Sequence, residues 1–323
     1  QQQAFEKFRD TAVRSPSENR LLIHKTAIYS VLFSKDGRTL VTGCEDKDSS
    51  IKLWDTATGA LRGHLPISAS TLELAFCSDG GVLASSHSGD GKVHLWDIAK
   101  REQITALSAG TSWKYWPSIQ CLAVAPSISL LASDGAGNFV YVWDLKKQKL
   151  LHTLGGHSKR ITALAFSRDG STLAVASLGE GAGLYCPGVL KLWDPKEGRE
   201  IVELKGHTGY IEALAFAANG KTLISAGYNE NRDGEVLIWD VVNKSEKGTF
   251  KTVLNDVQEL ALSPDGRRIA IAGNDPRVRI LDTMQAAEPR EIKFQSGRVS
   301  SMAFSSDAET LAIGAADGTV RIR

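Results

Sequence analysis

One segment recurs seven times along this chain of 323 residues, and its spacing is the strongest constraint on the fold. Each copy contains an apolar run, a short turn such as Ser-Lys-Asp-Gly, a second apolar run, and a third run that usually ends in Trp-Asp. The third-run tryptophan, replaced by Leu281 in the sixth copy, recurs at intervals of 42, 47, 50, 46 and 42 residues. A unit this short cannot bury its apolar residues alone, so successive copies must stack on one another.

The pattern inside each copy predicts β-strands. In the fifth copy, residues 211–216, 222–226 and 235–239 alternate or run apolar, and an outer strand is expected near residues 249–252. A repeat of about 40–45 residues that ends in Trp-Asp is typical of the four-stranded blades of a propeller. We therefore predict an all-β fold, a seven-bladed β-propeller that occupies residues 20–323.

The two ends of the repeat region complement each other. The seventh copy stops at its third strand, at Arg323, and residues 20–24 precede the first copy with no other blade to join. We predict that these residues pair with the last blade and close the ring, which removes two exposed sheet edges. Residues 1–19 form an N-terminal extension. Its apolar residues have near-helical spacing up to Val13, which suggests a short helix on the propeller rim, or a linker or docking helix from a longer protein.

Five Trp-Asp dipeptides and the Gly-His pairs at Gly156-His157 and Gly206-His207 resemble the WD-repeat β-propeller family over residues 20–323. The resemblance implies that each blade joins a histidine, a strand hydroxyl, a turn aspartate and the tryptophan by hydrogen bonds. An indole N–H can only donate, so a buried tryptophan needs such an acceptor. Two copies have every member of the set: His24, Thr42, Asp48 and Trp54, and His207, Ser225, Asp233 and Trp239. We interpret these sets as structural and not catalytic.

The other copies depart from the set. Ile67 stands at the histidine position of the second copy, and Tyr115 at that of the third. The fourth copy keeps His157 and Trp193 but has Val175 at the hydroxyl position. Isoleucine replaces the hydroxyl in the sixth and seventh copies, so apolar contacts are expected to replace the polar chain there.

Bulk properties exclude several classes of function. The net charge of +1 argues against a nucleic-acid partner, and no apolar run approaches the roughly 18–20 residues of a membrane span. The four cysteines suggest no disulfide and favour a reducing, cytoplasmic compartment, although a removed signal peptide stays open. No zinc, calcium or phosphate-loop spacing is complete, so we predict no metal, no cofactor and no catalytic residues.

Interruptions of the repeat point to a binding face. Insertions at residues 44–50, 177–188, 228–234 and 110–118 are all expected to open on the same face of the ring, and loops on rigid scaffolds carry function. One insertion holds three aromatic residues, of the types enriched at binding hot spots, although they could instead pack over the blade edge. In the family, partners often contact residues that flank the first apolar position of each inner strand. The resulting candidate partner-binding residues are Tyr29, Trp113, Tyr115, Trp116, Arg160, Tyr185, Tyr210, Tyr228 and Arg298.

Together these features predict a non-catalytic scaffold or recognition module that binds a protein or peptide partner on the loop-rich face. The repeat also resembles the WD-repeat segments of larger bacterial signalling proteins. The chain could therefore be the sensor or regulatory part of a larger protein, and we expect a monomer when it is isolated. The alternative is a propeller enzyme with its site at the central channel, although no acid/base or metal constellation in the sequence points there.

Overall fold

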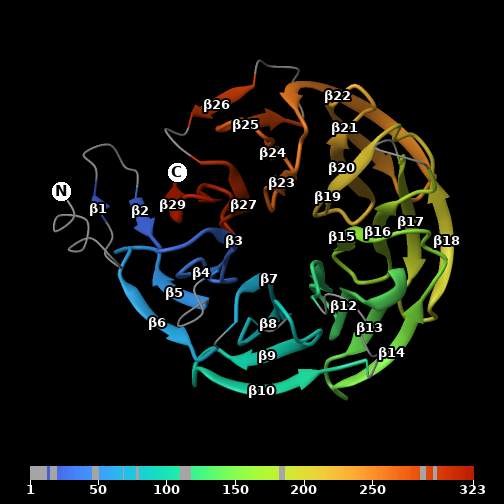
Figure 1. Cartoon of the computed structure of the whole chain (residues 1–323). Helices are drawn as coiled ribbons and strands as arrows, with labels where there is room; N and C mark the ends of the chain where they lie inside the picture. The colour runs from blue at the N-terminus through green and yellow to red at the C-terminus, as the bar shows by residue number, and fades with distance from the viewer. Residues whose placement is uncertain are drawn as a thin grey trace.

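The structure, a computed structural model, is a ring of seven four-stranded blades arranged in chain order around a central channel (Figure 1). It describes residues 13–14, 20–45, 51–67, 69–77, 80–109, 118–181, 186–283, 289–293 and 297–323, with the backbone alone for 13–14, 20–21 and 251–253. Each sheet is antiparallel, and its first strand is nearest the channel. The predicted seven-bladed propeller is therefore confirmed. No helix in the described part of the chain has the length and apolar character of a membrane span.

The first three blades lie within residues 28–154. Blade 1 consists of β3 (Ile28–Phe33), β4 (Thr39–Cys44), β5 (Ile51–Asp55) and β6 (Leu61–Leu65). Blade 2 consists of β7 (Thr71–Phe76), β8 (Val82–His87), β9 (Val93–Asp97) and β10 (Glu102–Leu107). Blade 3 consists of β11 (Leu122–Val124), β12 (Leu130–Asp134), β13 (Val140–Asp144) and β14 (Lys149–Leu154), with a short 3₁₀ turn, η1 (Ala136–Asn138), between β12 and β13.

The next three blades follow the same plan. Blade 4 consists of β15 (Ile161–Phe166), β16 (Leu173–Leu178), β17 (Gly188–Asp194) and β18 (Arg199–Leu204). Blade 5 consists of β19 (Tyr210–Phe216), β20 (Thr222–Tyr228), β21 (Asp233–Asp240) and β22 (Ser245–Asn255). Blade 6 consists of β23 (Glu259–Leu262), β24 (Arg268–Ala272), β25 (Arg277–Asp282) and β26 (Arg290–Lys293).

Blade 7 draws strands from both ends of the chain. It consists of β27 (Val299–Phe304), β28 (Leu311–Ala315), β29 (Thr319–Ile322) and β2 (Arg20–Ile23), and β1 (Val13–Arg14) adds a short fifth strand at its edge. The register of β2 on β29 pairs Arg20 with Ile322 and Leu22 with Val320. The predicted closure by the N-terminal strand is thus confirmed. Val13 lies in a strand and not in the suggested helix, while residues 1–12 lie outside the described part.

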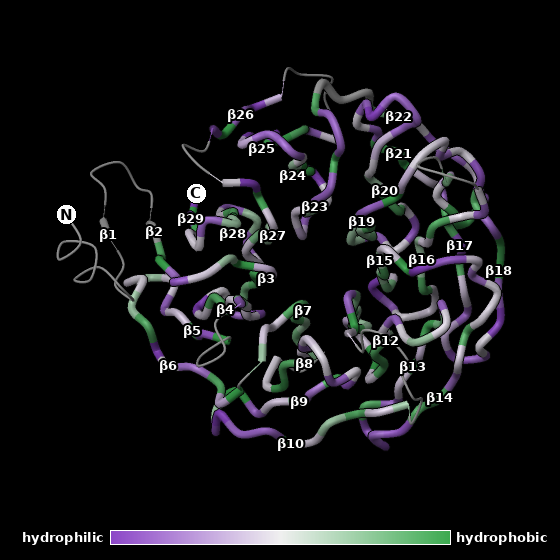
Figure 2. Tube along the Cα trace, in the orientation of Figure 1, coloured by the Kyte–Doolittle hydropathy of each residue, from purple (hydrophilic) through white to green (hydrophobic). Residues whose placement is uncertain are grey.

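The hydrophobic core lies between adjacent blades. At the seam of the ring, Leu22 and Val320 of blade 7 pack against Ile28 and Trp54 of blade 1, and all four are fully buried. The outer strands β18 and β22 contain many hydrophilic residues, whereas apolar residues concentrate in the inner and middle strands (Figure 2). This gradient explains why the middle strands read as nearly continuous apolar runs in the sequence.

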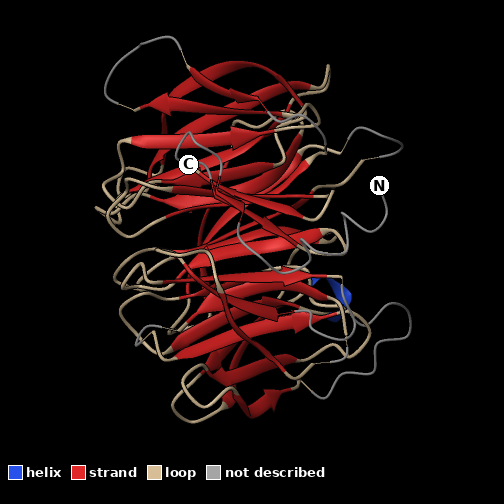
Figure 3. Ribbon diagram, turned by 90° about the vertical axis from the view of Figure 1, so that its left-hand side faces the viewer, coloured by secondary structure: helices blue, strands red, loops and turns tan. Residues whose placement is uncertain are grey.

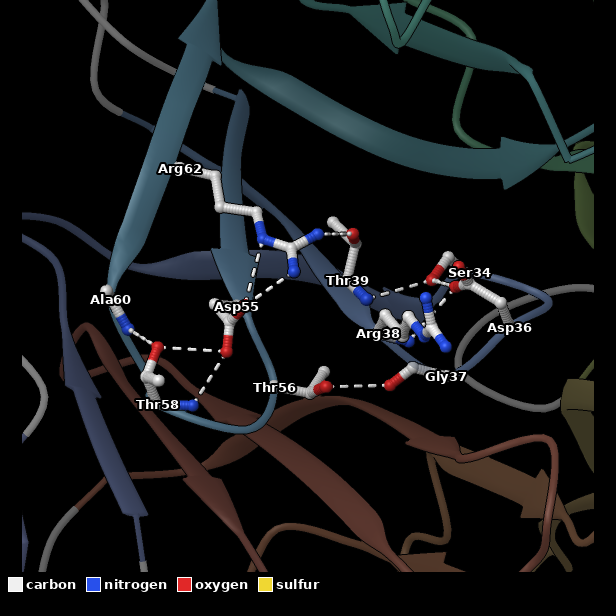
Figure 4. Close-up of polar contacts among 10 residues, drawn as sticks. All are labelled: Ser34, Asp36, Gly37, Arg38, Thr39, Asp55, Thr56, Thr58, Ala60 and Arg62. Carbon is white, nitrogen blue, oxygen red and sulfur yellow. Dashed lines mark hydrogen bonds and ion pairs between the residues drawn. The ribbon is translucent and has the colours of Figure 1, made fainter.

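The Ser-x-Asp-Gly motif forms the turn between the first two strands of a blade. In blade 1, Asp36 Oδ1 accepts from Ser34 Oγ at 2.6 Å and from the Arg38 N–H at 3.0 Å, and Ser34 Oγ accepts from the Thr39 N–H (Figure 4). Gly37 has a φ of 69°, in the left-handed region that glycine tolerates best. The motif therefore satisfies its own backbone donors at an exposed turn.

The aspartate of the Trp-Asp dipeptide organises the next turn on the same face. Asp55 Oδ1 accepts from the Thr58 N–H at 2.7 Å, and Asp55 also pairs with Arg62 (Figure 4). The equivalent aspartates of blades 2 to 5 accept backbone N–H groups three residues further on in the same way. Seen from the side, the molecule is a thick disc whose loops lie on two opposite faces (Figure 3).

The opposite face carries the connections between second and third strands and between successive blades; we call it the insertion face. Contacts join these connections. Ser70 Oγ donates to Glu45 O, and Arg232 forms an ion pair with Asp256 at 3.0 Å. The insertion at 228–234 lengthens a hairpin, because Tyr228 pairs with Gly234 across β20 and β21, and only residues 229–232 form the turn.

Candidate functional site

The central channel contains a cavity of about 600 Å³ that inner strands of all seven blades line. Residues at equivalent positions of these strands form tiers around the channel. The first tier is nearest the insertion face, and each later tier lies further along the inner strands. Arg160 and Arg298 stand at the outermost tier. The next tier holds mainly polar residues, namely Tyr29, Gln120, Thr162, Glu212, Gln258 and Ser300. The third tier is Ser30, Glu73, Cys121, Ala163, Ala213, Glu259 and Ser301, and an apolar tier lies beyond it: Val31, Leu74, Leu122, Leu164, Leu214, Leu260 and Met302.

A β-bulge near the start of the inner strand shapes the wall of this channel. The pairing of first and second strands skips one residue in blades 1, 2, 4, 5 and 7, for example between Thr71 and Glu73. A bulge sets two residues opposite one and redirects a side chain. As a result, consecutive residues such as Tyr29 and Ser30 both line the channel.

Carboxylates give the third tier an unusual chemistry. Burial raises the pKa of Glu73 to about 7, although Glu73 accepts from Ser30 Oγ at 3.0 Å and from the Leu74 N–H. Burial, with the charge of Glu73 as a second cause, raises the pKa of Glu259 well above its usual value. Two carboxyl groups that share a confined, poorly hydrated space cannot both ionise at low cost.

Asp134 at the end of β12 belongs to the same electrostatic system. Its Oδ1 accepts from the N–H groups of Gln120 and Cys121, each at 2.9 Å, so it fixes the backbone where β11 begins. Burial nevertheless raises its pKa to about 7, and burial with the Asp134 charge raises the pKa of the Cys121 thiol well above its usual value. The nearby guanidinium of Arg160 opposes the shift of Asp134.

Sequence reasoning missed this group of acids. It found no acid/base constellation at the channel, whereas the structure gathers Glu73, Asp134, Glu212 and Glu259 at or beside it. A signal was nevertheless present, because Glu73 and Glu259 each interrupt an apolar inner-strand run, in Thr-Leu-Glu-Leu-Ala-Phe and Val-Gln-Glu-Leu-Ala-Leu.

The predicted partner-binding residues fall into three groups. Tyr29, Arg160 and Arg298 line the channel together, and Tyr29 is 37% exposed. Tyr210 and Tyr228 lie beside it, with their rings stacked at 5.0 Å between centroids and Arg232 over the Tyr228 ring. Both tyrosines line a small cavity of about 40 Å³ together with Cys186. The remaining residues, Trp113, Tyr115, Trp116 and Tyr185, lie outside the described part of the chain.

The two complete hydrogen-bond sets take the following form. In blade 1, Trp54 Nε1 donates to Thr42 Oγ1 at 2.9 Å, and this hydroxyl lies 3.1 Å from His24 Nε2; Asp48 lies outside the described residues. In blade 5, Trp239 Nε1 donates to Ser225 Oγ at 2.8 Å, and Ser225 Oγ lies 2.6 Å from His207 Nε2. The members are buried between blades and away from the channel.

The carboxylate beside His207 is not the expected one. Glu235 Oε2 lies 3.2 Å from His207 Nδ1, whereas the Asp233 N–H and carboxylate both bond to Asn229 in the β20–β21 turn. The lengthened hairpin accounts for the exchange. It places Asp233 close to the turn and brings Glu235, two residues further along β21, level with the imidazole.

Blades 2 and 4 depart from the pattern in opposite ways. Blade 2 lacks a histidine at Ile67, but His87 at the end of β8 places Nε2 2.7 Å from Ser85 Oγ, which also accepts from Trp96 Nε1. In blade 4, Trp193 Nε1 is buried with no hydrogen-bond partner among the described residues, because Val175 replaces the hydroxyl. In blade 2, therefore, the imidazole of the hydrogen-bond set comes from a strand of the sheet itself.

None of the four cysteines forms a disulfide bond. In the part of the chain that the structure describes, no three His, Cys, Asp or Glu side chains are grouped as metal ligands.

Seven sheets of this plan, closed by an N-terminal strand and carrying Trp-hydroxyl-His sets between blades, define a seven-bladed repeat propeller. Comparison with known families narrows this class. The family model "WD domain, G-beta repeat" matches residues 17–55, 56–97, 148–194, 198–240 and 290–323, and the chain belongs to this family. The third and sixth blades lie largely outside these matches, yet they have the same four-stranded plan.

Relatives with known names are longer proteins. The chain is 32% identical over 121 residues to the "WD repeat and SOCS box-containing protein 1" of Danio rerio, which covers 37% of this chain and 27% of the relative. It is 28% identical over 160 residues to the "Periodic tryptophan protein 2 homolog" of Dictyostelium discoideum, covering 48% and 16%. For the "Autophagy-related protein 16" of Arabidopsis thaliana, the identity is 24% over 206 residues, covering 51% and 40%. The chain thus spans less than half the length of each of these relatives.

Proposed function

We propose that this propeller is a non-catalytic recognition module that binds a protein or peptide at the mouth of the central channel, on the insertion face. The observation that carries the proposal is the composition of this mouth. Tyr29, Arg160, Glu212 and Arg298 converge on one cavity, and an apolar tier lies beneath them. Aromatic and arginine anchors beside a concave surface are the features that dominate protein interfaces.

The partner that fits this mouth is a segment with mixed charge. Arg160 and Arg298 offer guanidinium groups, which bind carboxylates in a bidentate manner, while the carboxylates of the deeper tier favour a basic or neutral polar group. A polyanion such as a nucleic acid fits this mouth less well, because Glu73, Glu212 and Glu259 offer it no positive charge. The aromatic insertion of Trp113, Tyr115 and Trp116, with Tyr185, would extend the same surface.

The lengths of the relatives support a role as one module of a larger protein. Each named relative continues well beyond the matched segment, and one of them joins WD repeats to a SOCS box in its name. We infer that the propeller supplies recognition and that other segments supply the response, as in a sensor or regulatory protein.

Charge reversal at the channel mouth tests the proposal. Peptides would be selected from a displayed library on immobilised wild-type protein, and their affinities measured for three variants. Arg160→Glu with Arg298→Glu should weaken binding at least tenfold, and Trp113→Ala with Trp116→Ala should weaken it as well. Lys149→Glu is the matched control, since it reverses an exposed charge on the outer strand β14. Selected peptides that bind all three variants equally would place the site elsewhere.

The rival function is an enzyme with its site in the channel. One observation favours it, because carboxyl groups with a pKa near 7, such as those of Glu73 and Asp134, suit proton transfer at neutral pH. WD-repeat propellers are generally non-catalytic, which favours recognition. Turnover of a bound peptide or small molecule that Glu73→Gln abolishes, with binding retained, would establish the enzyme instead.

A further inference from the structure

A lysine and a cysteine meet on the insertion face at an unusually short distance. Lys159, in the connection between β14 and β15, places Nζ 2.8 Å from Sγ of Cys186, in the connection between β16 and β17. The same Nζ donates to Gly181 O at 3.0 Å, and Cys186 Sγ lies 3.7 Å from that oxygen. Hydrogen bonds from nitrogen to the smaller oxygen atom usually measure about 2.9–3.0 Å. The nitrogen and the sulfur are thus in direct contact, and no atom separates them.

We propose that Lys159 and Cys186 form a reversible covalent cross-link when the protein meets a peroxide. Cys186 is 4% exposed, but it lines the small cavity of about 40 Å³ that Tyr210, Tyr228 and Arg232 also line. A site needs only about 10–15 Å³ to hold a water molecule, so hydrogen peroxide can be accommodated beside the sulfur.

The chemistry balances with peroxide as the only oxidant. The Cys186 thiolate attacks one peroxide oxygen, an S–O bond forms, the O–O bond breaks, and hydroxide leaves with the electron pair. The hydroxide takes a proton from the Lys159 ammonium and becomes water. The neutral amine then attacks the sulfur of the sulfenic acid, an S–N bond forms, the S–O bond breaks, and a second water leaves. Sulfur is oxidised, the peroxide is reduced, and the product is a sulfenamide that thiols can reduce.

The other cysteines lie in different surroundings. Cys121 Sγ contacts the carbonyl oxygen of Ile161 at 3.9 Å, and burial raises the pKa of its thiol well above the usual value. Cys44 is fully buried in the core cluster at the seam of the ring, and Cys77 is buried in the core cluster between blades 2 and 3. Selective reaction at Cys186 is therefore expected, and it would tie together two connections that are 27 residues apart. One of them leads directly into Arg160 at the channel mouth.

Mass spectrometry of peroxide-treated protein tests the cross-link. The folded wild-type chain would be treated with a small excess of hydrogen peroxide, blocked with an alkylating reagent, and digested with trypsin. We expect the peptide of residues 150–160, uncleaved at Lys159, to be joined to the peptide of residues 169–191 and lighter than their sum by two hydrogen atoms. Treatment with dithiothreitol should separate the two peptides again.

Three variants make the result specific. Lys159→Arg keeps the positive charge and the donors but should give no joined peptides, and Cys186→Ser should give none either. Lys191→Arg changes another lysine of blade 4, whose Nζ bonds to Glu200 at 2.9 Å, and should cross-link like the wild type. Melting curves of the reduced proteins establish that each variant is folded. After oxidation, the melting temperature should rise for the wild type and for Lys191→Arg alone.

Two outcomes would overturn the proposal. In the first, oxidation of the folded wild type leaves the Lys159 peptide free and converts Cys186 to sulfinic acid. In the second, the cross-link forms equally well in urea, which would show that the folded geometry does not direct it.

Discussion

The indole N–H of Trp239 donates to Ser225, whereas that of Trp193 is buried with no partner among the described residues. These residues occupy equivalent positions in neighbouring blades, so the chain contains its own control for the value of the hydrogen bond. A buried donor without an acceptor loses its hydration and gains nothing in return.

Phenylalanine substitutions should separate the two cases. Trp239→Phe should lower the free energy of unfolding by about 1–3 kcal/mol, because it removes the hydrogen bond that Trp239 Nε1 donates to Ser225 Oγ. The cost of Trp193→Phe should be smaller than that of Trp239→Phe by about 1 kcal/mol or more. Both variants lose contact area, but Trp193→Phe removes a donor that has no hydrogen bond to lose. Urea unfolding followed by circular dichroism measures both. Equal costs would show that the hydrogen bond contributes nothing. A double-mutant cycle with His207→Ala should also show non-additive costs.

The acids of the channel should make stability depend on pH. The pKa of Glu73 is raised to about 7 from 4.5, so the folded protein binds this proton more tightly than the unfolded chain does. Its contribution is present below pH 4.5 and is lost as the pH rises towards 7. Glu73→Gln should therefore leave stability almost unchanged near pH 4.5 and raise it at pH 8, by at most about 3 kcal/mol. The measurement is the difference in the free energy of unfolding between variant and wild type across this pH range. Buried histidines such as His87 titrate in both proteins, so their contribution cancels in the difference. A flat difference would refute the shift.

Individual site residues were less predictable than the blades that carry them. Ile67 correctly indicated that blade 2 lacks its usual histidine, but nothing in the repeat register showed that His87 would contact Ser85 from the end of its own strand. The exchange of Asp233 for Glu235 depends on the length of one hairpin. Side-chain reach and hairpin geometry are three-dimensional quantities, which a repeat alignment does not contain.

Among the elements, the turn between the first two strands shows how closely sequence and backbone agree. The glycine of the Ser-x-Asp-Gly motif has φ values of 69°, 70° and 74° at Gly37, Gly170 and Gly266. In blade 7 the corresponding residue is Ala308, whose φ is 64°. An L-residue with a side chain in this conformation costs about 1–2 kcal/mol.

Reciprocal substitutions should reveal this strain. Gly37→Ala should lower the free energy of unfolding by about 1 kcal/mol, because an added Cβ would meet only Ser306 Oγ at an ordinary 3.5 Å and the cost is conformational. Ala308→Gly should be neutral or stabilising by a few tenths of a kcal/mol, since relief of strain exceeds the gain in unfolded-state entropy. Thermal unfolding compares the two. A stabilising Gly37→Ala would contradict the assignment.

Strand bulges explain why the blades were predictable and the channel lining was not. Apolar periodicity places the strands to within a few residues, as the fifth repeat shows. A bulge adds one residue opposite a single partner and thereby changes which side chains reach the channel, and its position leaves no mark in the apolar pattern. Glu73 follows such a bulge, and Glu259 occupies the equivalent place in blade 6.

At the scale of the whole molecule, the ring depends on the short strand β2. Its residue Leu22 is fully buried against the neighbouring blade at the seam. Removal of this strand would leave β29 as an exposed edge with unpaired backbone groups.

Truncation tests the seam. Deletion of residues 1–25 should abolish cooperative unfolding or cause aggregation, measured by urea unfolding and by light scattering after gel filtration. The milder Leu22→Ala should lower the free energy of unfolding by about 2–5 kcal/mol, as for other buried leucines. Ile201→Ala, at an outer-strand residue that is 38% exposed, should cost much less. An unchanged melting temperature of the truncated chain would show that the seam does not hold the ring.

Closure by β2 also determines how early during synthesis the ring can close. Arg20 pairs with Ile322, so β2 leaves the ribosome before any complete blade and must wait until all the blades that lie between it and β29 have been made. At about 5–20 residues per second, this interval is roughly 15–60 s. During this interval, therefore, the segment Arg20–Ile23 remains without its partner strand while six blades assemble behind it. That segment must be protected by a chaperone or by slow local collapse. This protection is required while the protein is being made, and it is not required for the stability of the finished ring.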